Sequence, residues 1–434
     1  MAVDQWLHAG LGGLPLQGLL NELPDELALR ALAAVPEEAN AKELKLDGSL
    51  RPQLLLELQH AAPEVLQHLS ARAGERSLPA ATSWLALCRS TASLLEELGQ
   101  ATLPHAAQLL REDSERSGPA AEFLETLMEK SGACDQCPER LAQSLLVLLG
   151  HLQPTGAEAR PEQMARHRLG RLVSAAVDAW RRFYVVPGTP REVWVTLLEA
   201  LIACGSWGHQ LALVALPSWL GLHEQALKAG PEVFETYAPV LLKAARNLRN
   251  ASVFPGDFHQ WMPEDTETFL QFRRELRDFL RELGTEKTGA ENGGSPKARQ
   301  RKSGPGVLLP LLVEEIHRDL VQALVESSQW QPTEEALHAL SALAKEIMVM
   351  APAHPIAGRV LELLRLLAGD QSPLLRPGCH RQLISIFVQC ASVFGPLCTL
   401  DEATFSKIFT LARASLRIVE EAPTQHTADT LDDE

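Results

Sequence analysis

Apolar side chains recur at intervals of three and four residues along most of the chain. The clearest case lies between residues 269 and 283, where this spacing places the apolar positions on one face of a helix. These positions are Phe269, Phe272, Leu276, Phe279, Leu280 and Leu283. The opposite, polar face is predicted to carry Arg273, Arg274, Glu275, Arg277 and Arg281. The segment is therefore predicted to form an amphipathic helix with one buried face.

The same pattern, cut by Pro and Gly, predicts helices along nearly the whole chain. A second stripe runs from Leu337 to Ile347, and Thr333 before Glu334 is a plausible start signal. No stretch alternates with the period of two that a half-buried strand requires, so strands are not expected. Helices are predicted over residues 14–22, 25–35, 51–71, 78–98, 101–111, 118–130, 138–152, 161–184, 190–204, 208–228, 231–250, 263–283, 307–327, 331–350, 353–368, 375–395 and 401–421.

Pairs of these helices recur at roughly forty residues, the period of HEAT and armadillo units. One pair cannot bury its apolar face alone, and stacking on its neighbours completes the core. The predicted fold is therefore all-α, an α-solenoid of HEAT-like antiparallel helix pairs. Two arrays are expected, over 1–284 and 307–421. Between them, 285–306 is expected to be a basic low-complexity linker, and 422–434 an acidic disordered tail.

Composition and charge narrow the class of protein. The 434 residues are 46% apolar but only 5% aromatic, which favours Leu- and Ala-rich helices. Forty Lys and Arg against 55 Asp and Glu give a net charge of −15. This charge argues against direct nucleic-acid binding and suits a basic protein partner. Seven scattered cysteines indicate a reduced, intracellular protein, and no apolar run is long enough to cross a membrane.

The cysteine and histidine spacings give no complete metal or catalytic site. Cys134 and Cys137 have the spacing of half a zinc site, but no second pair completes four ligands, so loop cysteines are the simpler interpretation. Four cysteines on or beside helical stripes are interpreted as small core residues: Cys204, Cys379, Cys390 and Cys398. Four of the dispersed histidines have no partner at a ligand or triad spacing: His105, His151, His167 and His223.

The sequence also lacks a carboxylate pair or a known motif that would indicate catalysis. The adjacent carboxylates Glu37–Glu38 and Glu96–Glu97 do not face each other on a helix, so no shared-proton pair is implied. No metalloprotease, nucleophile-elbow or phosphate-loop motif is present. We therefore expect no enzyme activity, no catalytic, cofactor-binding or metal-binding residue, and no cofactor.

The basic run 297–302 and the tryptophans each have two interpretations, one structural and one in ligand binding. The basic run 297–302 is either a solvated loop or a nuclear-localisation or polyanion-binding patch. Six tryptophans are expected mostly to pack between helices, although some could line shallow apolar grooves that accept Phe-containing peptides. They are Trp84, Trp180, Trp207, Trp219, Trp261 and Trp330.

Four blocks, taken in order, resemble the importin-β superfamily, most closely the branch of transportin-SR and importin thirteen. The first, 27–38, is similar to a helix that ends in a Leu-Pro-Glu-Glu turn, and the second covers 197–222. The third, 263–278, resembles an acidic turn followed by Phe-x-x-Phe-Arg and a downstream Asp. The fourth, 330–337, is similar to the helix start Trp-x-x-Thr-Glu-Ala.

This resemblance implies a nuclear transport receptor, or a truncated portion of one. It implies basic or Arg/Ser-rich protein cargo, contacts with Phe-Gly nucleoporins, and shuttling between nucleus and cytoplasm. Receptors of this branch are longer and begin with further repeats that hold the main Ran-binding surface, so Ran-GTP is a doubtful partner. The alternative is a HEAT-repeat scaffold or adaptor in another assembly, because helical repeats alone do not fix function.

Overall fold

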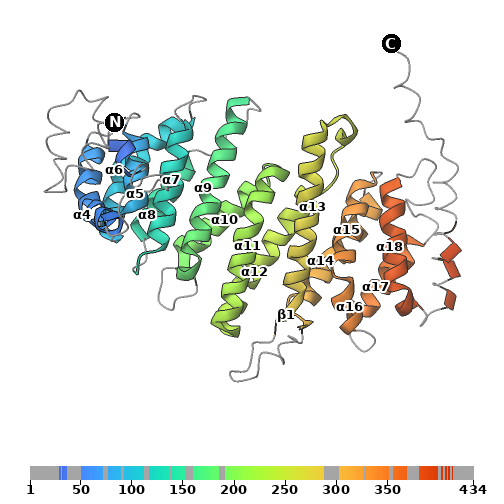
Figure 1. The fold of residues 1–434 in the computed structure, drawn as a ribbon. Coiled ribbons are helices and arrows are strands. Elements are labelled where there is room, and N and C mark those ends of the chain that lie inside the picture. Colours follow the sequence, from blue (N-terminus) through green and yellow to red (C-terminus); the bar gives the residue numbers. More distant parts are fainter. Residues whose placement is uncertain are drawn as a thin grey trace, which may run out of the picture. The chain divides into compact units, whose positions relative to one another are not determined.

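The protein is described from a computed structural model, in which nearly all the backbone described is α-helical (Figure 1). The chain divides into two compact units. The first combines Met1–Trp207 with Pro217–Ala229, and the second combines Gly208–Leu216 with Gly230–Glu434. The structure describes residues 29–30, 32–36, 50–71, 77–88, 92–111, 117–135, 139–151, 160–184, 191–287, 303–326, 329–350, 355–368, 381–398, 402–403, 406–407, 409–410 and 413.

The first unit is a stack of amphipathic helices. Its helices are α4 (Leu50–Ala71), α5 (Leu78–Leu87), α6 (Ala92–Arg111), α7 (Ser117–Gly132), α8 (Glu139–His151), α9 (Arg160–Tyr184) and α10 (Arg191–Gly205). Helix α6 contacts α4, α7 and α8, and α7 contacts α5 and α9, so each helix packs against near neighbours in sequence. This nearest-neighbour packing is typical of solenoids. Trp84, Phe123 and Trp180 are completely buried in its core.

The second unit continues with the same kind of packing. Helix α11 (His209–Ala229) belongs to the second unit as far as Leu216 and to the first unit from its internal Pro217 onward. The other elements are α12 (Pro231–Ala251), the 3₁₀ turn η1 (Phe258–Gln260), α13 (Pro263–Gly284), α14 (Leu309–Glu326), α15 (Gln331–Ala342), α16 (Ala344–Met350), α17 (Pro355–Leu367) and α18 (Arg381–Cys398). Helix α15 contacts α13, α14 and α18. The predicted all-α, solenoid-like fold is confirmed within each unit.

One residue separates α11 from α12. Gly230 has a φ of 113°, a conformation that side chains rarely adopt, and Pro231 follows as the first residue of α12. The glycine ends one helix and the proline starts the next with its φ already suited to a helix. This junction explains why the sequence predicts both helix ends well.

Two helix breaks differ from the sequence prediction. The break expected at 99–100 lies instead between α5 and α6, after Cys88. Gly99 is inside α6, where an added Cβ would collide with the Leu141 side chain, so this glycine permits close packing and does not end the helix. The helix predicted over 331–350 is divided at Leu343 into α15 and α16.

The expectation of no strands was wrong at one place. Thr285–Lys287 (β1) pairs antiparallel with Ser303–Pro305 (β2), with Glu286 opposite Gly304. The Gly306 amide also donates to the Gly284 carbonyl at 2.8 Å. Three-residue strands are too short to leave an alternating pattern in the sequence.

The two ends of the predicted linker, 285–306, form the paired strands. Its basic run, 297–302, lies outside the described residues, as does the predicted tail. The division into two arrays and a linker stays a prediction. Among the helices that the structure describes, none has a stretch long and apolar enough to cross a bilayer.

Candidate binding site

Four aromatic rings gather where α12 leads into α13. Phe254, Phe258 and Trp261 belong to the connection, and Phe269 lies on α13. Neighbouring ring centroids are 4.8 to 5.7 Å apart, within the range in which aromatic pairs attract each other. The cluster holds this irregular connection against α13.

Arg273 is buried beside this cluster, with only 4% of its surface exposed. Its Nη1 and Nη2 donate to the two carboxylate oxygens of Glu334 at 2.9 and 2.8 Å. Nη1 also donates to the Ser252 carbonyl at 3.1 Å, and the guanidinium lies 4.3 Å from the centre of the Phe254 ring. Arg273 therefore joins α13, the connection that follows α12, and α15.

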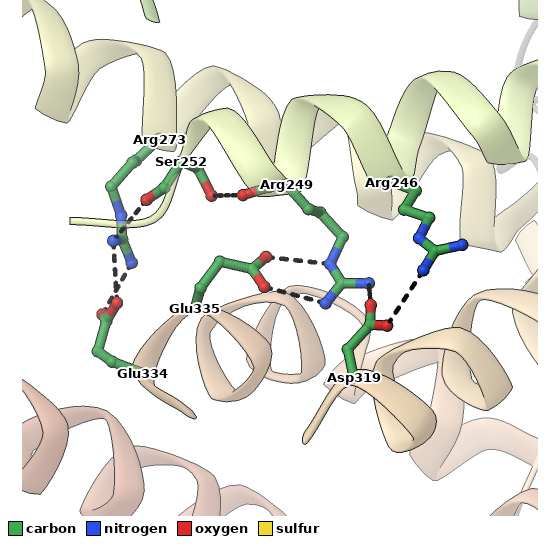
Figure 2. Close-up of polar contacts among 7 residues, drawn as sticks. All are labelled: Arg246, Arg249, Ser252, Arg273, Asp319, Glu334 and Glu335. Atoms are coloured by element: carbon green, nitrogen blue, oxygen red, sulfur yellow. Dashed lines mark hydrogen bonds and ion pairs between the residues drawn. The ribbon is translucent and has the colours of Figure 1, made fainter. Parts of the chain in front are cut away.

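Arg249 of α12 forms a second buried bidentate pair, shown in Figure 2. Its Nε and Nη2 donate to Glu335 at 3.0 and 2.9 Å, and its Nη1 donates to Asp319 of α14 at 3.0 Å. The other oxygen of Asp319 lies 4.0 Å from Nη2 of the half-exposed Arg246. Three helices are therefore held through one guanidinium.

The two pairs form one network (Figure 2). The arginines come from α12 and α13, and the carboxylates come from α14 and α15. Ser252 links the pairs, because its hydroxyl donates to the Arg249 carbonyl at 2.8 Å while its own carbonyl accepts from Arg273. Glu334 and Glu335 are adjacent in sequence and point to different arginines, as neighbours on a helix must. The network fixes the relative positions of four helices inside the second unit.

Burial and ion pairing act in opposite directions on these groups. Burial raises the pKa of Glu334 and Glu335 above the ordinary value, and their arginine partners pull it back. Burial also disfavours the charge on Arg249, but the combined attraction of Glu335 and Asp319 exceeds that cost and raises its pKa. We assign Glu334 and Glu335 as ionised, because each accepts from a fork of two N–H donors, which requires an anionic acceptor.

A groove of about 750 Å³ lies next to this network, between α13 and α15. Its apolar lining includes Phe254, Trp261 and Leu270, and its basic lining includes Arg274 and Arg277. Leu270 is 41% exposed, so its apolar side chain is accessible to a ligand in the groove. The combination of apolar surface and exposed arginines suits a peptide better than a metal or a catalytic reaction.

His338 lines the same groove from α15 and is neutral at ordinary pH. Burial, together with the charges of Arg273 and Arg277, lowers its pKa from 6.5 to about 3. The positive charge of the groove therefore comes from arginine, and it does not change between pH 5 and 8.

Within the described residues, the cysteines singled out in the sequence are buried, and the adjacent pair Glu96–Glu97 is divided between an ion pair and solvent. Cys204 and Cys390 are buried, as predicted, and burial raises the pKa of each thiol to about 12. Cys134 is also buried, while Cys137 and Cys379 lie outside the described residues. Glu96 lies 4.0 Å from Arg140 and Glu97 is exposed.

Three of the histidines singled out in the sequence lie on different helices: His105 on α6, His167 on α9 and His223 on α11. His167 is half-buried, with its pKa lowered by burial and by Arg171 and Arg168, and His223 is buried on α11. His105 has a buried ring nitrogen without a hydrogen-bond partner. Within the described part of the chain, no group of three or more metal-ligating side chains could hold a metal ion.

The sequence pattern missed the ion-pair network. Arg273 was expected on the polar face of its helix, but it is buried, because Glu334 and Ser252 satisfy its donors. Thr333 does not start a helix, since α15 begins at Gln331 and Thr333 is buried within it. The only sequence signal for the buried pair was the position of Arg273 directly after Phe272 of the apolar stripe. A charged residue at such a position is usually exposed to solvent.

The tryptophans divide into two groups. Trp84, Trp180 and Trp219 are buried packing residues, as predicted. Trp261 and Trp330 are partly exposed in the second unit, and Trp261 lines the groove. Trp207 is partly exposed as well, at the turn that follows α10.

Comparisons with known proteins leave the family open. No protein-family model matches the chain, and no curated protein matches it. A crystal structure of an engineered protein is 17% identical and aligns over 96% of this chain and 98% of that chain, with a TM-score of 0.25. At that TM-score the likeness carries no argument about fold or function.

Proposed function

We propose that this chain is a nuclear transport receptor, or a portion of one, built from HEAT-like helix pairs that bind protein cargo. The observation that carries this proposal is the buried pair of Arg273 and Glu334. Arg273 ends the Phe-x-x-Phe-Arg block, and Glu334 lies in the Trp-x-x-Thr-Glu-Ala block. Because each residue needs the other when buried, their joint presence supports the resemblance to importin-β receptors more than either block does alone.

The charge of the chain supports basic cargo. The net charge is −15, and residues 285–306 contribute five Lys and Arg against two Glu, a local +3, so the rest carries −15 − 3 = −18. A stack of helix pairs offers an extended surface on which an Arg/Ser-rich segment can bind along many carboxylates. We infer cargo of this basic class.

Exposed apolar side chains support contacts with Phe-Gly nucleoporins. Large apolar residues on the helices are exposed at several separate positions, among them Val195, Leu311 and Leu366. A phenylalanine side chain of a Phe-Gly repeat needs only a shallow apolar site of this kind. With such contacts the protein would shuttle between nucleus and cytoplasm.

The cargo proposal is tested by pull-down with the full chain. An immobilised Arg/Ser-rich domain is compared with a matched Gln/Ser-rich control at about 0.05 and 0.5 M NaCl. We expect capture by the Arg/Ser-rich domain only, and a large loss at high salt, because the Debye length falls from roughly 14 Å to 4 Å. Equal capture by both domains, or capture indifferent to salt, would contradict the cargo class.

A second experiment separates a transport receptor from a scaffold in another assembly. The fluorescently labelled chain is added to permeabilised cells, with and without an excess of a soluble Phe-Gly repeat peptide. A transport receptor is expected to label the nuclear rim and to be displaced by the peptide. A diffuse signal that the peptide does not change would favour the scaffold.

A further inference from the structure

Leu270, Arg274 and Arg277 form one line along the exposed side of α13. Their spacing of four and three residues places them above one another on a helix. All three line the groove described above. At 1.5 Å per residue, Leu270 and Arg277 are about 10 Å apart along the helix axis.

The two arginines of this line are not neutralised. The neighbouring Arg273 is paired with Glu334, and Arg281 is paired with Asp278 at 2.9 Å. Arg274 and Arg277 have no carboxylate partner within the part of the chain that the structure describes. An uncompensated positive site in a chain of net charge −15 is a specific feature and not part of the general surface charge.

The groove also has a direction. Its other end is formed by Trp261, Pro263 and Glu267, next to the acidic first turn of α13, which contains Glu264 and Asp265. A continuous phosphate backbone would be repelled at this end. A short segment with an apolar side chain and localised carboxylates meets no such repulsion.

We propose that this groove binds a linear acidic segment of a partner protein, with an aromatic side chain against Trp261 and Leu270 and carboxylates against Arg274 and Arg277. In an extended segment each residue advances about 3.3 Å. The carboxylates that reach the two arginines therefore lie two to three residues from the aromatic anchor. This site is independent of the proposed cargo class, because basic cargo would be repelled here.

The test uses the full chain and fluorescein-labelled peptides in fluorescence anisotropy. The probe is GSGFEDDDGS, which carries one aromatic anchor followed by four carboxylates. The neutral peptide GSGFQNNNGS keeps the anchor, and GSGAEDDDGS keeps the carboxylates. We expect GSGFEDDDGS to bind at least roughly tenfold more tightly than either control, because each half supplies part of the affinity.

Variants then assign the binding to the groove. Arg274→Gln/Arg277→Gln is expected to weaken binding of GSGFEDDDGS by roughly tenfold, the effect of two exposed charge pairs. Arg281→Gln removes an exposed arginine of the same helix outside the groove and is expected to leave binding unchanged. Leu270→Ser is expected to weaken GSGFEDDDGS and to leave GSGAEDDDGS unaffected.

Several outcomes would overturn the proposal. It fails if GSGFEDDDGS does not bind, if GSGFQNNNGS binds equally well, or if the double variant binds as tightly as the unaltered chain. Equal binding by a Phe-Gly repeat peptide that the double variant does not weaken would make the groove a purely apolar site. None of these results bears on the salt-sensitive capture of Arg/Ser-rich cargo, so the two proposals can fail separately.

Discussion

Replacing Arg273 by methionine removes one partner of the buried pair and keeps most of the side-chain volume. Glu334 then loses both of its donors, at 2.9 and 2.8 Å, and the Ser252 carbonyl loses its bond at 3.1 Å. Both members of the pair are only 4% exposed, so the carboxylate left behind by the substitution is largely desolvated. An unpaired buried carboxylate costs about 3–5 kcal/mol, which is the expected loss of stability in the second unit.

The double variant Arg273→Met/Glu334→Leu gives the sharper expectation. It leaves no buried charge at this position, and only the Ser252 carbonyl loses its partner. We expect a loss of about 1–2 kcal/mol, less than that of either single variant. The two substitutions are thus expected to be strongly non-additive, with a coupling energy of several kcal/mol.

The measurement is amide hydrogen exchange on the full chain, followed in peptides that cover α13 and α15. A local probe is needed because two compact units do not have to unfold in a single transition. Arg274→Met is the matched control: it changes the next, exposed residue and is expected to alter stability by less than about 0.5 kcal/mol. If Arg273→Met exchanged like this control, or if the two single losses simply added in the double variant, the reasoning would be refuted.

Three further predictions concern residues that are buried or closely packed. His338 has a pKa of about 3 in the folded chain against 6.5 ordinarily, so the unfolded chain binds the proton first as the pH falls. The contribution of His338 should therefore lower stability by about 1 kcal/mol per pH unit between pH 6 and the folded pKa. His338→Gln should reduce that slope in urea titrations, and an unchanged slope would contradict the assignment. Gly132→Val should destabilise α7 by about 1–3 kcal/mol, because a Cβ there lies 2.7 Å from the Ala179 carbonyl carbon; unaltered exchange in α7 and α9 would count against this close approach. Cys204 and Cys390, whose pKa burial raises to about 12, should react with iodoacetamide at pH 8 only as fast as the chain opens, and rapid labelling seen by mass spectrometry would show that they are accessible.

The sequence predicted the helices well where Pro and Gly breaks agree with the apolar periodicity. The predicted helices 161–184, 231–250 and 263–283 match α9, α12 and α13 to within one residue at each end. The error at Gly99 arose because a glycine that ends a helix and a glycine that admits a neighbouring side chain look alike in sequence. Only the packing partner, Leu141, distinguishes the two.

The candidate site could be predicted only in part. The aromatic spacing identified Phe269 and Phe272 as core residues, and Trp261 was among the tryptophans considered for grooves. Arg273 was misplaced because its burial depends on Glu334, which is 61 residues away in the sequence. The apolar pattern of one helix cannot detect a partner on another helix. Only the three-dimensional structure shows that a buried arginine is paired with a buried carboxylate.

The ribbon of β1 and β2 has a consequence for how this region can change. Because Thr285 pairs with Pro305, the end of α13 and the approach to α14 are held together by backbone bonds, whatever sequence lies between the strands. Doubling the length of the enclosed segment would cost only about 0.6 kcal/mol in closure entropy. An insertion between β1 and β2 therefore leaves the packing of α13 and α14 unchanged. The segment between the two strands is a position at which the chain can gain or lose a module, or carry an engineered tag.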